Sequence, residues 1–151
     1  MVKKKKDLEY YEGIGRRKLA VARVRLFIIN KNNAVTVGGK KLSKGDVVIN
    51  GKMLADTYTS DAFKKRFNQP FELTSNVDRF ATSILVSGGG PNGQLEAIIH
   101  GVSRALVVAD PDTYKNILRE SGLLTRDPRT RERRKVGTGG KARRQKQSPK
   151  R

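Results

Sequence analysis

Residues 20–28 read AVARVRLFI, and every even position in this run carries an apolar side chain. The odd positions include Arg23 and Arg25. Because successive side chains of a strand point to opposite faces of a sheet, this period of two predicts a strand with one buried face. Residues 80–86 repeat the pattern, which predicts a second such strand whose inner face carries Phe80, Thr82, Ile84 and Val86.

Shorter signals fill the segment between these two strands. The run Asn30–Asn33 is typical of a turn, so residues 34–37 are expected to return as the second strand of a hairpin ending at Gly38-Gly39. Residues 47–49 predict another short strand, closed by Asn50-Gly51. Residues 52–68 have patchy helical character, with Ser60 or Asp61 as the cap, and Gln69-Pro70 is expected to end that helix.

Two helices are expected after the second strand. Residues 94–109 place Leu95, Ile98, Val102, Leu106 and Ala109 on one helical stripe. Asp110-Pro111 is typical of an N-cap followed by proline, and Gly122 suits the left-handed position that ends the next helix near Ser121. The resulting order β-β-(α)-β-α-α predicts an α+β fold, a compact two-layer sandwich with helices covering one face of a sheet.

The last 26 residues, 126–151, have a different composition. They contain twelve Lys or Arg and two acids, a net +10 of the chain's formal +19. Their only aliphatic side chains are Val136 and Ala142, so this segment cannot bury enough apolar surface to fold alone. We expect an extended arm that uses the phosphates of nucleic acid as its counter-charge.

Several classes of protein fit the sequence poorly. No apolar run is long enough to span a membrane, and the opening MVKKKK lacks the apolar stretch that would follow it in a signal peptide. With no cysteine and one histidine, His100, the chain offers no histidine–cysteine metal site, and no catalytic constellation is evident. We therefore expect no enzymatic activity, cofactor, bound metal, small-molecule substrate or membrane partner.

Residues 88–93, GGGPNG, satisfy the pattern G-x-G-x-x-G between a predicted strand and a predicted helix. That context is the one required of a dinucleotide-binding loop. However, a second helix and the basic arm follow, which leaves no strand for a ribose-binding acid. The alternatives are a tight glycine turn and a close approach of bare backbone to an RNA strand.

A basic cluster precedes the first predicted strand. Arg16-Arg17-Lys18 follows Gly13-Ile14-Gly15, which we interpret as a flexible glycine pair, and Arg23 and Arg25 continue on the polar face of the strand. This arrangement predicts a platform for phosphate groups.

Three motifs in this order resemble the family of the ninth protein of the small ribosomal subunit, bacterial type. They are GIGRRKLAVARVRLF, SGGGPNGQLEAIIHGVSRAL and GLLTRDPRTRERRKVGTGGKARR with a final KR, and the similarity runs from about Tyr10 to Arg151. The resemblance implies a body that shares its fold with the second domain of the fifth small-subunit protein. It also implies that GGGPNG is a family feature and not a cofactor loop.

The resemblance further implies partners: the 3′ major domain of 16S-type rRNA in the subunit head, neighbouring head proteins and the peptidyl-site tRNA. Carried over by position, contact with the backbone of the tRNA anticodon stem-loop falls on Lys150 and Arg151. The family usually ends Gln-Phe-Ser-Lys-Arg, whereas this chain ends Gln147-Ser148-Pro149-Lys150-Arg151. The location is then the ribosome, in the cytoplasm or in an organelle.

The expected organisation is a basic extension (1–9), a globular rRNA-binding body (10–125) and the basic tail (126–151). The alternatives are a nucleic-acid chaperone outside the ribosome and a nucleotide-dependent enzyme. The residues expected to bind rRNA are Arg16, Arg17, Lys18, Arg23, Arg25, Arg104, Arg126, Arg129, Arg131, Arg133, Arg134, Lys135, Lys141, Arg143, Arg144 and Lys146.

Overall fold

The computed structural model describes residues 2–5, 8–29, 34–134 and 136. In these ranges the chain forms, in order, β1 (Val2–Lys5), β2 (Leu8–Arg17), β3 (Ala20–Ile28), β4 (Val35–Val37), β5 (Lys40–Leu42), β6 (Val47–Ile49), β7 (Lys52–Met53), α1 (Leu54–Thr57), α2 (Asp61–Leu73), β8 (Phe80–Ser87), α3 (Pro91–Ala109) and α4 (Pro111–Glu120).

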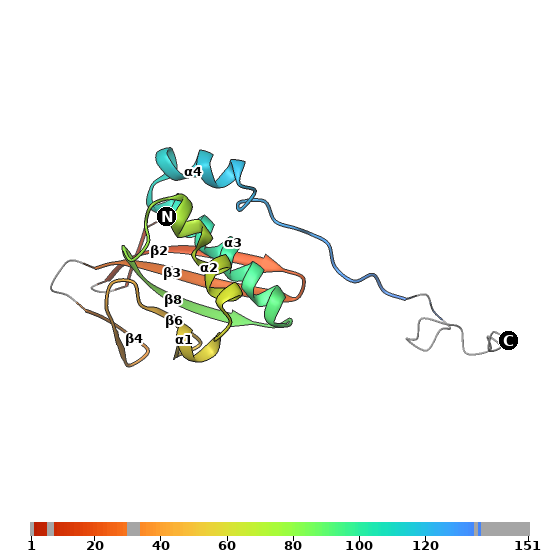
Figure 1. Ribbon diagram of the computed structural model, residues 1–151, viewed down its shortest axis with the longest axis horizontal. Helices are drawn as coiled ribbons and strands as arrows, with labels where there is room; N and C mark the ends of the chain where they lie inside the picture. Colours follow the sequence, from red (N-terminus) through yellow and green to blue (C-terminus); the bar gives the residue numbers. More distant parts are fainter. Residues whose placement is uncertain (1, 6–7, 30–33, 135, 137–151) are drawn as a thin grey trace.

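One six-stranded sheet, in the order β1-β2-β3-β8-β6-β7, forms the centre of the molecule. Its paired neighbours run antiparallel, except that β6 lies parallel to β8. Helices α2 and α3 lie together on one side of this sheet, and the described start of the tail leads away from the body (Figure 1). The predicted α+β fold with helices on one face of the sheet is confirmed.

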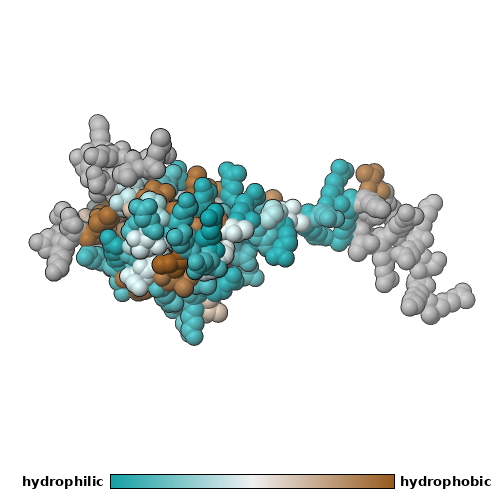
Figure 2. Space-filling model, turned by 90° about the horizontal axis from the view of Figure 1, so that it is seen from above, coloured by the Kyte–Doolittle hydropathy of each residue, from teal (hydrophilic) through white to brown (hydrophobic). Residues whose placement is uncertain are grey.

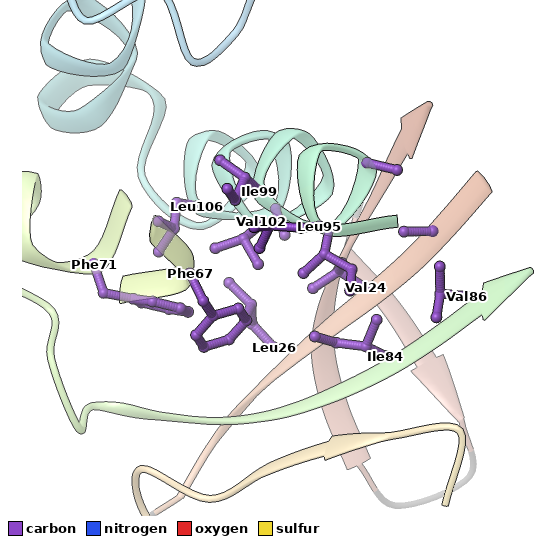
Figure 3. Close-up of a cluster of buried hydrophobic side chains, with 14 of the residues drawn as sticks. Val24, Leu26, Phe67, Phe71, Ile84, Val86, Leu95, Ile99, Val102 and Leu106 are labelled. Carbon is purple, nitrogen blue, oxygen red and sulfur yellow. The ribbon is translucent and has the colours of Figure 1, made fainter. Parts of the chain in front are cut away.

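The main core lies between the sheet and α2 and α3. The expected stripe of α3 is buried, from Leu95 to Leu106, and it packs on the inner side chains of β3 and β8 such as Val24 and Ile84 (Figure 3). Phe67 and Phe71 of α2 close the side of this core. The predicted inner face of β8 is confirmed, because Phe80, Thr82, Ile84 and Val86 are all buried, but the alternation begins only after Ala81, which is buried on the opposite face.

The alternation in β3 holds from Ala20 to Leu26 and then fails. Ile28 is 45% exposed, whereas Phe27 on the opposite face is buried. Phe27 belongs to a second, smaller core with Tyr10 and Ala81, to which the β4–β5 hairpin contributes Val35 and Leu42. The β4–β5 hairpin therefore covers one end of the outer face of the sheet, the face opposite the helices.

Residues 34–37 were predicted to pair with the strand at residues 20–28, and this prediction is wrong. Strand β4 pairs with β5 across Gly38-Gly39 and is not part of the main sheet. Both glycines have positive φ (58° and 80°), the conformation that the two central residues of a type I′ hairpin turn require. The Gly-Gly pair thus joins two strands, where we expected it only to end one. The predicted turn at residues 30–33 lies outside the described residues.

The segment before residue 20 forms strand β2, whereas we interpreted its two glycines as a flexible pair. Gly13-Ile14-Gly15 and the first two residues of the basic cluster, Arg16 and Arg17, belong to a strand paired with β3 over residues 10–17, so the glycines are not a flexible pair. A Cβ atom at Gly13 would lie 2.6 Å from the backbone nitrogen of Ala105, and one at Gly15 would overlap the carbonyl oxygen of Ala97. Both glycines are needed because α3 lies directly on the strand.

The predicted break at Gln69-Pro70 is also wrong, because α2 continues through Pro70 to Leu73. An internal proline costs a helix about 3 kcal/mol. Phe67, three residues before the proline, and Phe71, directly after it, are buried, and each buried phenylalanine contributes about 1.5 to 3 kcal/mol. Tertiary packing therefore outweighs the local penalty.

Both ends of α4 follow the sequence prediction. The Asp110 side chain accepts a hydrogen bond from the backbone N–H of Thr113 (3.2 Å). At the other end Gly122 has φ 74°, and the N–H of Leu123 donates to the carbonyl of Leu118 (3.0 Å), which is the Schellman arrangement. At the start of the chain, β1 pairs with residues 8–11 of β2, so the expected N-terminal extension contributes a strand to the sheet edge.

Candidate nucleic-acid interface

The outer face of the sheet is open over β2, β3 and the end of β8. The strand register aligns its side chains in three rows across the sheet: Glu12–Arg25–Ser83, Ile14–Arg23–Leu85 and Arg16–Val21–Ser87. Arg16 and Arg23 are exposed, and they lie among Ile14, Val21 and Leu85, which are 38–48% exposed. Among the described residues neither arginine forms an ion pair, so both side chains are accessible to phosphate groups.

Arg25 lies in the same face but has partners within the protein. Its Nε donates to Glu12 at 3.1 Å, and its guanidinium lies 4.9 Å from the centre of the Tyr10 ring. Of the three arginines on this face, Arg25 is therefore the most constrained.

The Arg16-Arg17-Lys18 triplet divides among three environments. Because side chains of a strand alternate, Arg16 lies on the open face, whereas Arg17 lies on the α3 side with Gly13 and Gly15. Lys18 is exposed in the β2–β3 turn at φ 51°. Of the residues predicted for the platform, Arg16 and Arg23 thus lie on the open face and Lys18 lies in the adjoining turn, while Arg17 faces α3.

The edge of β2 beyond its pairing with β1 is covered by side chains of α3. Arg104 donates from Nη1 to the carbonyl oxygen of Ile14 at 2.7 Å. His100, one turn earlier, accepts a long bond (3.5 Å) at Nδ1 from the backbone N–H of Arg16. Together these residues satisfy polar groups that a bare strand edge would expose.

The environment of His100 favours the neutral imidazole. Partial burial lowers its pKa most, and the charges of Arg104 and Arg126 lower it further, while a hydrogen bond to the Leu124 backbone partly opposes them. A neutral ring is also what the bond from Arg16 requires, since a protonated imidazole has no acceptor nitrogen.

We expect the free energy of unfolding to fall as the pH is lowered through about 6.5, the pKa of an unfolded histidine. Below that pH the unfolded chain binds a proton at His100 that the folded chain binds only at lower pH, so acid favours unfolding. Urea unfolding between pH 8 and pH 5 measures this effect. Since His100 is the only histidine, the His100→Gln variant should lack this part of the pH dependence. Parallel curves for the two proteins would contradict the assignment.

The tail begins at a junction of charged side chains. Arg17 forms an ion pair with Glu96 of α3, and its Nη2 lies 3.1 Å from Oδ2 of Asp127. Its Nη1 also donates to the carbonyl of Arg129 at 2.8 Å. A hollow of about 160 Å³ lies beside this junction, and its lining includes Arg16, Arg17, Arg66, Glu96, His100, Arg126 and Asp127.

Beyond the junction, the tail shows neither helix nor strand in its described part, residues 126–134 and 136. Its surface is mostly hydrophilic in the view of Figure 2. The exposed arginines here are Arg126, Arg129, Arg131, Arg133 and Arg134. The other predicted contact residues of the tail lie outside the described residues: Lys135, Lys141, Arg143, Arg144, Lys146, Lys150 and Arg151.

The glycine-rich loop packs against the β2–β3 turn. Gly88 and Gly89 have positive φ, and a Cβ atom at Gly89 would lie 3.1 Å from the Cβ of Ala20. The next element after α3 is α4, so the second parallel strand of a dinucleotide fold does not follow. These glycines allow the chain to reverse tightly between β8 and α3. This is the glycine turn expected from the sequence as one alternative to a dinucleotide-binding loop.

The same described ranges contain no metal site and no membrane-spanning helix. Among these residues, no group of three or more His, Cys, Asp or Glu side chains is placed to hold a metal ion. No helix in the described part of the chain has the length and apolar character needed to cross a membrane.

A comparison with protein-family models matches residues 15–151 to the family described as ribosomal protein S9/S16. The chain belongs to this family. The match covers most of the open sheet face, the junction and the whole tail. It contains the second and third motifs in full and the first motif from Gly15 onward. The resemblance inferred from these motifs is confirmed.

Family membership defines the general role. The chain is a structural, RNA-binding constituent of the small ribosomal subunit that takes part in translation, and its partners include rRNA and other ribosomal proteins. The family is a structural one and not an enzyme family.

Sequence reasoning missed Glu96 and Asp127, the two acids that face Arg17. Asp127 did carry a signal, because it is one of only two acids in a segment with twelve basic residues. Glu96 carried no such signal, since single acidic residues are common on the surfaces of helices.

Proposed function

We propose that this protein binds 16S-type rRNA in the head of the small subunit through two surfaces. Arg16, Lys18 and Arg23 would hold phosphates at the open sheet face and the adjoining turn. The tail would lie along the RNA, where its charge offsets the repulsion between crowded phosphate backbones.

The observation that carries this proposal is the exposed row of arginines from Arg126 to Arg134, which continues directly from a folded body. This part of the tail forms no helix or strand of its own, and its arginine side chains are exposed, with Arg129 also paired to Asp127. The salt dependence of RNA binding, with and without the tail, tests the assignment.

We further propose that the tip of the tail contacts the backbone of peptidyl-site tRNA through Lys150 and Arg151. The support is their position in the family motif and their terminal basic pair. Contacts to phosphates position a nucleic acid without reading its sequence.

Deleting Lys150 and Arg151 is expected to weaken tRNA binding to the peptidyl site similarly for different tRNAs. Each exposed charged contact contributes roughly 0.5 to 1 kcal/mol, so the loss of both should lower affinity roughly 5- to 30-fold. The measurement is the affinity of small subunits carrying the deletion for several tRNAs.

A matched control replaces Arg143 and Arg144 with glutamine, which removes the same charge from the middle of the tail. This control should reduce rRNA binding and leave tRNA affinity nearly unchanged. Unaltered tRNA affinity in the tip deletion would refute a direct contact, and a loss confined to one tRNA would refute recognition through the backbone.

A further inference from the structure

Arg17 joins three parts of the chain through separate nitrogens of one guanidinium. Its Nε pairs with Glu96 on α3, its Nη2 lies 3.1 Å from Asp127, and its Nη1 donates to the backbone carbonyl of Arg129 at 2.8 Å. A lysine has a single charged nitrogen and cannot reproduce this planar, forked arrangement.

The tail side of this junction is itself ordered by local bonds. Asp127 accepts hydrogen bonds from the backbone N–H of Arg129 (2.9 Å) and from the Arg129 guanidinium (2.6 Å at Nη2). These bonds, with the nearby charge of Arg17, hold the pKa of Asp127 well below its usual range, so the carboxylate stays charged at neutral pH.

Burial distinguishes Arg17 from the other basic residues of the surface. Its side chain is 12% exposed, whereas that of Arg129 is 83% exposed. Exposed ion pairs contribute little because water and salt screen them, whereas a partly buried pair is screened less. Arg17 is placed there by β2, whose close packing on α3 holds the backbone of the neighbouring residues in position.

We propose that Arg17 is a positioning residue that fixes the direction in which the basic tail leaves the body. Glu96 orients the guanidinium, and Asp127 with the Arg129 carbonyl holds the root of the tail against it. A segment ordered in this way before RNA arrives loses less conformational entropy on binding. The inference concerns the protein by itself and is independent of whether the tail reaches tRNA.

Distance measurements between two spin labels on the isolated protein test this proposal. The chain contains no cysteine, so Lys65→Cys on α2 and Thr130→Cys in the tail provide a unique exposed pair. An unrestrained segment of six residues beyond Leu124 would spread over about 12 to 15 Å. We expect a single narrow distance distribution in the otherwise wild-type protein and a severalfold broader one in Arg17→Met.

Three further variants make the result specific. Lys18→Met removes the same charge from the next residue and should keep the narrow distribution. Asp127→Asn leaves the body contacts of Arg17 in place and should broaden the distribution, and the double variant Arg17→Met/Asp127→Asn should be no broader than either single variant. Thermal unfolding of each variant reports separately on the body, so loss of the fold is not mistaken for release of the tail.

Two outcomes would overturn the proposal. One is an unchanged distribution in both Arg17→Met and Asp127→Asn. The other is broadening in Arg17→Met with none in Asp127→Asn, which would assign the effect to the pair with Glu96 in the body.

Discussion

Removing residues 126–151 is expected to flatten the salt dependence of RNA binding more than any other change to this chain. The segment carries twelve of the chain's 33 basic residues. If about eight of them neutralise phosphates, the slope of log affinity against log salt should become shallower by about 6 to 7, because each contact releases condensed counterions. Affinity for 3′-domain rRNA, measured between 50 and 200 mM salt, gives this slope directly.

A shorter deletion is the control for this experiment. Cutting after Arg134 removes residues 135–151 and seven of the twelve basic residues, so the change in slope should be a little more than half as large. The body should remain folded in both cases, because the cores in the described part of the chain involve no residue beyond Leu124. An equal slope with and without the tail would show that the tail is not the main electrostatic contact.

Gly15→Ala is expected to destabilise the fold by about 3 kcal/mol, the upper range for overpacking a core. The added Cβ would overlap the carbonyl oxygen of Ala97 and crowd the backbone of Gly101. Both are backbone atoms of α3, so no side chain can rotate away to make room. Relief requires moving the helix off the sheet, which would open the main core. Urea unfolding measures the loss.

Gly93→Ala is the matched control, and its expected effect has the opposite sign. Gly93 lies in the first turn of α3, where a Cβ would make an ordinary contact 3.8 Å from the Cβ of Ala20. Replacing a helical glycine with alanine stabilises a helix by up to about 1 kcal/mol. If Gly15→Ala were as stable as the control, the close approach of β2 and α3 would not be a constraint on this fold.

A large part of the architecture could be predicted from local patterns. The alternation in residues 20–26 and 80–86 placed two central strands, and the stripe from Leu95 to Leu106 placed the helix that covers them. The caps at Asp110 and Gly122 also follow from their own residues. In each case one face of one element is uniformly apolar, or one residue suits one backbone conformation, so no distant partner is needed for the prediction.

The sequence predicted which segments carry the basic residues, but it predicted only part of how their side chains are arranged. Composition alone identified the tail, because a segment that lacks apolar side chains cannot fold by itself. Within Arg16-Arg17-Lys18, however, the three charges look equivalent in the sequence. Only the pairing of β2 with β3 places Arg16 on the open face and Arg17 on the opposite face, next to Glu96 and Asp127.

Strand β2 and the continuation of α2 through Pro70 were decided by tertiary structure, whereas the partner of β4 was decided by the local Gly38-Gly39 turn. Gly13 and Gly15 have no side chain, so they contribute nothing to an alternating pattern, and their role becomes clear only when α3 lies on them. The β4–β5 pairing is local, since only two residues of positive φ separate the strands, and a Gly-Gly pair is itself a sequence signal for such a hairpin. Pro70 disfavours a helix in isolation, and the burial of Phe67 and Phe71 outweighs it. The sequence by itself determined the elements with a uniform apolar face and the basic tail, whereas contacts between distant segments determined strand β2 and the length of α2.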